Sequence, residues 1–233
     1  MSSSNKQATS GGFSLLELII AMAITMALMT AASTLLANAL RVRTRENQKS
    51  DALADTQRAI NIISREIANS GFNLNNNGIV AADSGLNQLR IRSNLNRFDY
   101  DPPTTDAMRA SVTDSGEDIT YFLNEVELTK YLARHDEYGT GSTVLANRID
   151  HMNIHYFNQA VTYTCAGAGN DITIQPGDEV KVTADVTQAK YIVLAVSVTL
   201  DPVGTFGSPG YQPPYSVLLC SDVALRNTDL WSY

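Results

Sequence analysis

The sequence predicts an α+β protein in which one long N-terminal helix packs on a β-rich globular head. Two observations lead to this fold class. An apolar run with a single charge extends from Ser14 to Leu40, and an amphipathic pattern continues it to about Ser70. Beyond Gly71, short segments rich in β-branched and aromatic residues alternate with turns rich in Gly, Pro and Asn, as is typical of strands and loops.

The apolar run is long enough to cross a membrane. Its roughly 27 residues would form a helix about 40 Å long, whereas a bilayer core is about 30 Å thick. Glu17 is the one charged residue in the run. A carboxylate costs about 2.5 kcal/mol or more at the membrane centre and less near an interface. Glu17 is therefore a candidate functional residue, because something must offset that cost.

The helix is expected to continue past the apolar run. Five residues spaced 3, 4, 3 and 4 apart lie on one helical face: Leu53, Thr56, Ile60, Ile63 and Ile67. No proline occurs between Phe13 and Ser70, so nothing forces a kink. The helix is expected to end at Asn69-Ser70-Gly71, with Gly71 at its C-terminal cap. We interpret the apolar face as the contact between helix and head.

Strand-like segments are expected throughout the head because of their β-branched and aromatic content. They cover residues 89–92, 119–123, 126–132, 149–157, 161–165, 191–200 and 215–225. The second and third are expected to form a hairpin that turns near Asn124-Glu125. Residues 202–214 contain four prolines and three glycines, which indicates a long irregular surface loop.

The net charge limits the class of partner, and the cysteine content indicates a possible disulfide. The formal net charge of −7, with no evident basic face, argues against nucleic acid as a partner. Cys165 and Cys220 could form one disulfide if the head is exported, and each adjoins a stretch rich in Gly or Pro. Closing that loop of about 55 residues would stabilise the fold by about 4 kcal/mol in the chain-entropy model. Two unpaired cysteines are the alternative.

The sequence contains no convincing catalytic or metal-binding pattern. His151 and His155 would suit a metal on a helix, but their segment is expected to be a strand, which separates them by about 13 Å. Asp178, Glu179 and Asp185 lack the dense spacing and central glycine of a calcium loop. Neither a nucleophile elbow nor a phosphate-binding loop motif is present. We therefore expect no enzymatic activity, no cofactor and no metal.

The segment Gly12-Phe13-Ser14-Leu15-Leu16-Glu17 resembles the processing site of type IV pilins and of the related pseudopilins of type II secretion. The resemblance implies that prepilin peptidase cleaves after Gly12 and methylates the new N-terminal amine of Phe13. It also implies that Glu17 acts in assembly, by pairing with the α-amine of a neighbouring subunit.

Three simpler interpretations of this N-terminal region fit less well. A secretory signal peptide has a shorter apolar core, of about 7–15 residues. An ordinary signal anchor fits the length but gives no reason for Glu17 or for the Gly-Gly-Phe junction. A buried core helix would not usually stay apolar on every face for so long.

The head shows weaker resemblances to PilW-type minor pilins and GspJ-type minor pseudopilins. Residues 119–123 and 128–132 resemble their hairpin, and residues 144–156 resemble the segment that follows it. The segment 223–227 is similar to the C-terminal pattern of PilW-type chains. The resemblance implies a pilin-like fold and a minor pilin that helps prime assembly of a type IV pilus, near its tip. The alternatives are a GspJ-type pseudopilin of a type II secretion system and, from another class, a membrane-tethered binding domain or enzyme.

The resemblance also implies a division of the chain into four parts. These are a prepilin leader at 1–12, a transmembrane and filament-core helix at 13–40, an amphipathic helix at 41–70 and a β-rich periplasmic head at 71–233. The implied partners are other minor and major pilins, prepilin peptidase, the inner-membrane assembly machinery and the lipid bilayer. The chain is expected in the inner membrane with a periplasmic head, and on the cell surface after assembly.

One observation opposes this orientation. Arg41, Arg43 and Arg45 directly follow the apolar run, and the positive-inside rule would place the head in the cytosol. The rule weakens for large translocated domains, and the processing motif requires the leader to be inside. The motif therefore decides the expected orientation.

Overall fold

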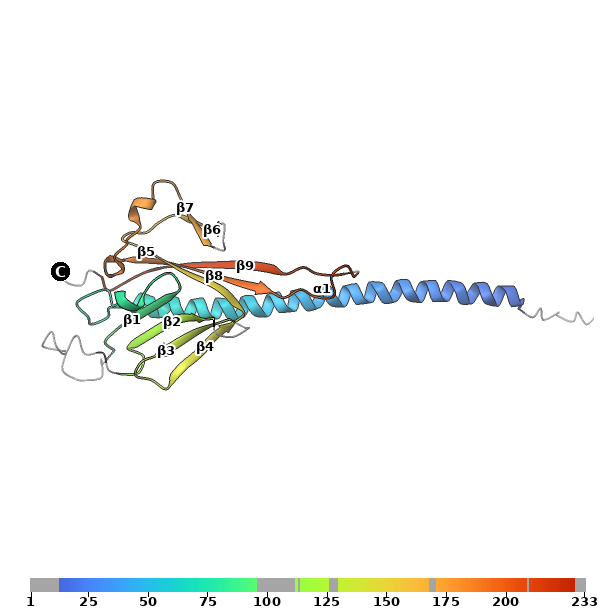
Figure 1. The fold of residues 1–233 in the computed structure, drawn as a ribbon, viewed down its shortest axis with the longest axis horizontal. Coiled ribbons are helices and arrows are strands. Elements are labelled where there is room, and N and C mark those ends of the chain that lie inside the picture. Colours follow the sequence, from blue (N-terminus) through green and yellow to red (C-terminus); the bar gives the residue numbers. More distant parts are fainter. Residues whose placement is uncertain are drawn as a thin grey trace, which may run out of the picture. The chain divides into compact units, whose positions relative to one another are not determined.

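The computed structural model describes residues 13–95, 112, 114–125, 130–167, 171–208 and 210–228. Within these residues, one long helix precedes a β-rich head, which confirms the predicted α+β pilin-like fold (Figure 1). The predicted leader, and Gly12 with it, lies outside the described residues.

Helix α1 (Leu15–Asn69) is continuous over 55 residues. It ends where the sequence predicted, at a glycine with left-handed backbone: Gly71 has φ 76°. The amide of Gly71 donates to the carbonyl oxygen of Arg92 at 2.9 Å instead of returning to the helix. A Cβ at this position would lie 2.5 Å from the carbonyl oxygen of Asn76. Gly71 thus ends the helix and also permits close approach of the next turn.

The chain forms two compact units, and α1 contributes to both. The first unit contains residues up to Arg45 together with 203–213. The second contains 46–202 and the residues from Pro214 onward.

The second unit holds three antiparallel sheets (Figure 1). Their strand orders are β1-β2-β3-β4, β5-β8-β9 and β6-β7. The strands are β1 (Gln88–Arg92), β2 (Asp118–Asn124), β3 (Tyr131–Asp136), β4 (Gly141–Asn147), β5 (Ile149–Phe157), β6 (Tyr163–Gly167), β7 (Asp171–Ile174), β8 (Tyr191–Leu200) and β9 (Tyr215–Ala224). Three short 3-10 helices complete the described elements: η1 (Ala81–Asp83), η2 (Glu179–Lys181) and η3 (Val186–Gln188).

The strand predictions are confirmed for β1, β2, β5, β8 and β9 within a residue or two. The expected hairpin is also present, because β2 pairs with β3, whose described residues begin at Tyr131. Residues 126–129 are not among those described. β4 and β7 were not predicted, because β4 is largely exposed and β7 is only four residues long. Antiparallel pairing with the preceding strand, β3 for β4 and β6 for β7, makes these segments strands more than local propensity does.

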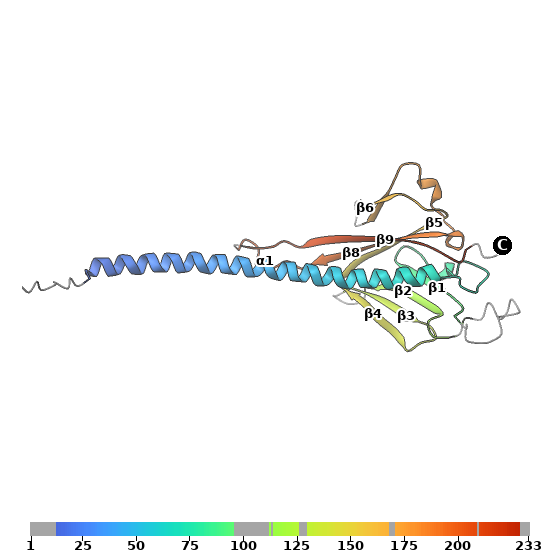
Figure 2. The ribbon, with the colours of Figure 1, turned by 180° about the vertical axis from the view of Figure 1, so that it is seen from behind.

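The second half of α1 lies between the two larger sheets and completes their core (Figures 1 and 2). Ile60, Ile63 and Ile67 are at most 1% exposed, and Thr56 is also buried. Leu53, the fifth residue of the predicted face, is half-buried. Burial of each large aliphatic side chain contributes about 1.5–3 kcal/mol. The predicted apolar face is therefore the contact that holds helix and head together.

The small β6-β7 sheet covers the other face of the β5-β8-β9 sheet. Phe157 and Val193 are fully buried there, and Ile172 and Ile174 of β7 pack against them. This cover explains why β8 is buried on both faces, in contrast to an ordinary half-exposed antiparallel strand.

Candidate functional site in the N-terminal helix

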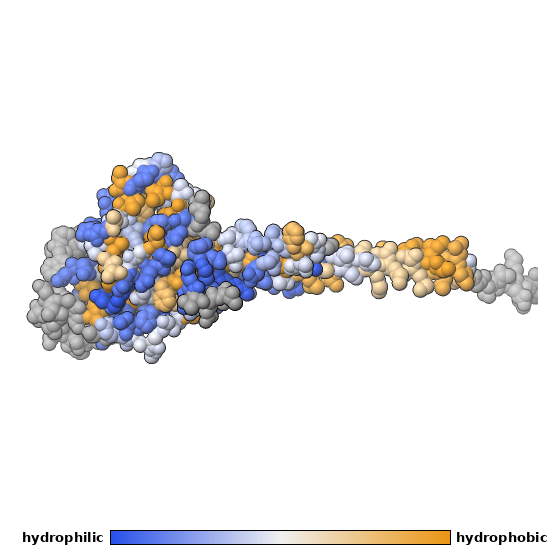
Figure 3. All heavy atoms as spheres, viewed as in Figure 1, coloured by the Kyte–Doolittle hydropathy of each residue, from blue (hydrophilic) through white to orange (hydrophobic). Residues whose placement is uncertain are grey.

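The first part of α1 is an apolar surface that the described part of the chain leaves uncovered. Every residue from 13 to 37 is exposed, and Leu15, Met29 and Leu35 are exposed by 76%, 75% and 70%. Figure 3 shows apolar side chains over this part of the helix. The helix is long and apolar enough to cross a membrane. So large an apolar surface marks a membrane or protein contact, because soluble monomers rarely expose one.

Polar side chains within this helix are mostly satisfied by the helix itself. The hydroxyls of Thr25 and Thr30 each donate to the carbonyl four residues earlier at 2.9 Å, and Thr34 donates to Ala31 at 2.8 Å. A hydroxyl bonded in this way is tolerated in lipid. These threonines therefore do not interrupt the apolar surface.

Glu17 cannot be satisfied in the same way, because a carboxylate has no proton to donate to a helix carbonyl. It lies in the first turn of α1, two residues after the helix begins, and is exposed. Its negative charge is favourable at a helix N-terminus. Phe13 is 83% exposed and, with Ser14, precedes the helix. The predicted cleavage at Gly12, the methylation at Phe13 and the role of Glu17 in assembly stay predictions.

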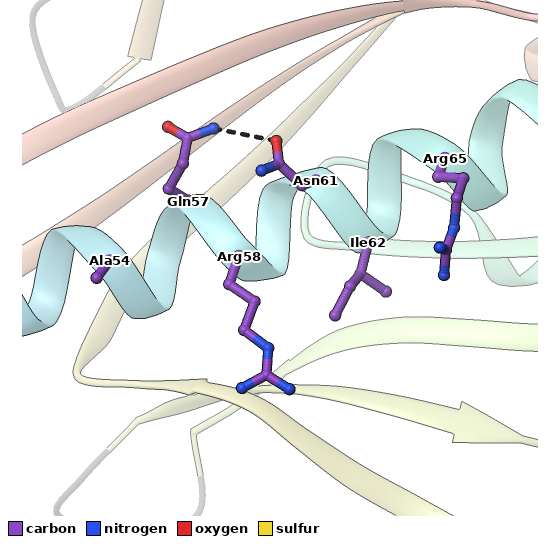
Figure 4. A pocket seen from close by; sticks show the side chains of 6 residues that line it. All are labelled: Ala54, Gln57, Arg58, Asn61, Ile62 and Arg65. Carbon is purple, nitrogen blue, oxygen red and sulfur yellow. Dashed lines mark hydrogen bonds between the residues drawn. The ribbon is translucent and has the colours of Figure 1, made fainter.

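The outer face of the second half of α1 carries a shallow, open groove (Figure 4). Its lining residues all come from this helix: Ala54, Gln57, Arg58, Asn61, Ile62 and Arg65. Gln57 donates to the side chain of Asn61 at 3.2 Å, and the two arginines extend away from that pair. Amides and guanidinium groups of this kind can form hydrogen bonds and ion pairs with another surface. The groove is therefore suited to contact with another surface.

A partly buried polar cluster ties α1 to the first sheet. The hydroxyl of Tyr121 on β2 donates to the carboxylate of Glu66, and Nε of Arg134 on β3 lies 3.2 and 3.1 Å from the two carboxylate oxygens. Burial and the charge of Glu66 raise the pKa of Tyr121, so its hydroxyl stays protonated and keeps donating. Sequence reasoning missed this cluster. The available signal was an acidic residue beside Ile63 and Ile67 of the buried face.

A second cluster joins β1 to β2 through Asp118, whose side chain is fully buried. Arg90 binds both of its oxygens, at 2.7 and 2.9 Å, and Nε of Arg92 lies 2.8 Å away. Burial alone would raise the pKa of Asp118. The hydrogen bonds from the two arginines outweigh burial, so the pKa lies below its usual range. The alternation of Arg90 and Arg92 in the sequence predicted the strand but not this partner.

The structure joins Cys165 on β6 and Cys220 on β9 by a disulfide, with 5.8 Å between their Cα atoms. The bond connects the small sheet to the edge of the β5-β8-β9 sheet. Near it, the hydroxyl of Tyr163 donates to Asp222 at 3.0 Å. Burial and this carboxylate raise the pKa of Tyr163 to about 12.

Most of the histidines and acidic residues considered from the sequence have partners in the structure: His155, Asp178, Glu179 and Asp185. His151 and His155 lie on β5, a strand as expected, and Nε2 of His155 is 2.7 Å from Asp171 on β7. Asp178 forms an ion pair with Lys181 at 2.9 Å. Over the described ranges, no group of three His, Cys, Asp or Glu side chains is arranged to hold a metal ion.

The fold and this helix define a class: a single-pass, membrane-anchored protein with a β-rich head. Residues 8–33 match the family model described as the prokaryotic N-terminal methylation motif. No curated protein and no solved structure matches the chain. The matched motif spans Gly12, Phe13 and Glu17 and, together with the long helix, indicates a type IV pilin-like prepilin.

Proposed function

We propose that this protein is a minor pilin of the PilW type, which helps prime the assembly of a type IV pilus at or near its tip. The observation that carries the proposal is the methylation motif at the start of a helix whose first half is wholly apolar and exposed. Such a helix suits both states of a pilin. It can reside in a bilayer as a single span, and it can later pack against other helices in a fibre.

An ion pair made by Glu17 would make the assembled fibre more favourable than the separate subunit in the bilayer. After cleavage, the methylated amine of Phe13 keeps its positive charge. Two opposite charges about 4 Å apart attract by about 4 kcal/mol at an effective dielectric constant of about 20. This is of the same order as the cost of about 2.5 kcal/mol or more for a carboxylate in a membrane. Pairing of Glu17 with a neighbour's amine therefore favours assembly and sets the axial register of the helices.

In this proposal the partners are other minor and major pilins, prepilin peptidase, the inner-membrane assembly machinery and the bilayer. The role is structural and uses no enzymatic chemistry. The shallow groove of Figure 4 is a further surface for contact with other subunits. The head faces the periplasm before assembly and the cell exterior afterwards.

The deciding experiment compares two phenotypes of a strain that lacks this protein. Surface pili and the export of type II substrates are measured in the same cells. Loss of pili with normal export is expected. Loss of export with normal pili would overturn the pilus role in favour of a GspJ-type pseudopilin. If both are normal, the protein belongs to another functional class.

Processing is tested by complementing that strain with Gly12→Val. A side chain at this position is expected to block prepilin peptidase, so that a longer, unprocessed chain accumulates in the inner membrane. Gly11→Val, one residue further from the cleavage point, is the matched control and should be processed. Mature protein of normal mass from Gly12→Val would contradict the prepilin assignment.

A further inference from the structure

The loop between β8 and β9 belongs to the first compact unit, together with the N-terminal part of α1. Nη1 of Arg41 lies 3.2 Å from Oγ of Ser208, and Arg45, only 7% exposed, donates to the carbonyl of Pro213. A Cβ on Gly210 would lie 2.3 Å from Oδ1 of Asn38. The loop therefore lies directly on α1 along residues 38–45.

The described residues of this loop, 203–208 and 210–213, bond to one another. Val203 and Gln212 exchange backbone hydrogen bonds of 3.0 and 2.9 Å across its base. Nearer the tip, the amides of Ser208 and Tyr211 donate to backbone carbonyls within the loop at 3.0 and 3.1 Å. Because these backbone groups are bonded internally, they can leave bulk water at little cost.

The tip of the loop presents an aromatic side chain to the outside. Phe206 is 87% exposed, and its ring meets the ring of Tyr211 edge to face, with centroids 5.5 Å apart. A phenyl group held this far out of the fold gains nothing from burial in the described chain. Its apolar area would be removed from water only by contact with something else.

The position along α1 identifies that contact. The apolar run from Ser14 to Leu40 is about 40 Å long as a helix, which matches a hydrocarbon core of about 30 Å plus part of both interfaces. Residues 38–45, where the loop packs, then lie at the level of the lipid headgroups. Tryptophan and tyrosine concentrate at this level, and phenylalanine is among the residues that segments bound at the interface bury in it. Arginine side chains are tolerated there.

We propose that loop 203–213 is a membrane-interface collar, which inserts Phe206 into the headgroup region of the leaflet on the head side. The collar would hold the subunit at one depth and would resist premature withdrawal of the helix. This inference rests on the membrane anchoring of α1 and not on the pilus role. It can therefore fail while the proposed function stands, and the reverse also holds.

The test uses the full-length protein in phosphatidylcholine vesicles with one reporter tryptophan. Trp231 is replaced by Phe, and Phe206→Trp supplies the reporter. We expect blue-shifted emission and at least a twofold loss of intensity in vesicles whose phosphatidylcholine is brominated at the upper acyl carbons. Val180→Trp, at an 83% exposed position of the second unit, is the control and should keep its intensity. Equal, water-like emission without quenching at both positions would overturn the proposal.

A matched pair of glycine variants tests whether the helix holds the collar in place. Gly210 and Gly207 have similar φ values of 76° and 80°, so alanine strains the backbone equally at both. Only at Gly210 would the added Cβ meet Asn38, because nothing lies within 4 Å of a Cβ at Gly207. Gly210→Ala should reduce quenching of the reporter at least twofold, and Gly207→Ala should not. Equal quenching in both variants would show that packing of the loop on α1 does not hold the reporter in the membrane interface.

The alternative to a lipid contact is that Phe206 packs against a neighbouring pilin. The reporter protein is therefore also measured in unbrominated vesicles, alone and after co-reconstitution with the other pilins of the same strain. The proposal expects the blue shift in the protein alone. A blue shift that occurs only with the other pilins would assign Phe206 to a subunit contact and overturn the lipid assignment.

Discussion

The carboxylates of Glu17 and Asp118 are stabilised in different ways. In the apolar half of α1, threonines donate to their own helix, whereas Glu17 needs a positive partner from outside it. In the head, Asp118 has two arginine partners within the fold. In the proposed function, the first arrangement favours association with another subunit, whereas the second favours folding. Substitution of Glu17 should therefore affect assembly, and substitution of Asp118 should affect stability.

Glu17→Ala is expected to be processed normally but to reduce surface piliation strongly, because the neighbour's amine loses its counter-charge. Removal of the carboxylate also removes its cost in the membrane, so insertion should not suffer. Glu17→Asp should keep partial function. Piliation is counted in a strain that lacks the native copy, with processing followed by the mass of the chain. Full piliation in Glu17→Ala would show that the pairing is dispensable in this subunit.

Asp118→Asn should lower the free energy of unfolding by about 1–3 kcal/mol at neutral pH, because it leaves two partly exposed arginines without their carboxylate. The folded pKa of Asp118 is depressed, so its stabilisation is present above the unfolded pKa of about 3.9. It is lost as the pH falls below that value. The difference between wild type and Asp118→Asn should therefore shrink between pH 5 and about pH 2.

Urea unfolding of the detergent-solubilised chain at several pH values measures this difference. Glu125→Gln is the control, since Glu125 pairs with Lys130 at 3.3 Å on an exposed surface. Its effect should stay within about 0.5 kcal/mol. A constant difference for Asp118→Asn from neutral pH to about pH 2 would exclude the ionised pair as its source.

Among the elements, α1 serves the two units in different ways. Up to Arg45 it is bonded to loop 203–213, and from Glu46 onward it supplies one face of the core. The turn that ends the helix is built on Gly71, whose amide bonds to β1 through Arg92. The helix end and the first strand are therefore one structural unit, which a single side chain can disturb.

Gly71→Ala is expected to destabilise the head more than the same change at Gly116. Both glycines have left-handed backbone, with φ 76° and 89°. Only at Gly71 would a Cβ meet backbone, 2.5 Å from Asn76, whereas nothing lies within 4 Å at Gly116. Strain of each kind costs about 1–3 kcal/mol, so Gly71→Ala should cost about twice as much. Equal melting temperatures for the two variants would contradict the close approach.

On the scale of the whole molecule, the buried core lies entirely in the second unit. Its helical contribution comes from residues 52–68, and the rest comes from the sheets and the segments that connect them. The apolar surface of the first part of α1 adds nothing to that core, because every residue from 13 to 37 is exposed. Folding of the head and membrane anchoring are therefore separable.

A chain that begins at Glu46 should be soluble and should show mixed helix and strand by circular dichroism. It keeps the buried core and loses the apolar run. Size-exclusion chromatography and far-ultraviolet spectra provide the measurement, with the full-length chain in detergent as the reference. Aggregation, or a predominantly helical spectrum, would show that the head depends on the N-terminal segment.

The sequence by itself determined the features that depend on local pattern. Apolar length predicted the membrane segment, the spacing of Ile60, Ile63 and Ile67 predicted the buried face, and β-branched runs predicted β5, β8 and β9. Only the tertiary structure decided the contacts between residues far apart in the chain. Glu66 meets Tyr121 and Arg134, and Arg41 meets Ser208, 167 residues away. Such partners follow from how sheets and loops return to one helix, which local periodicity does not encode.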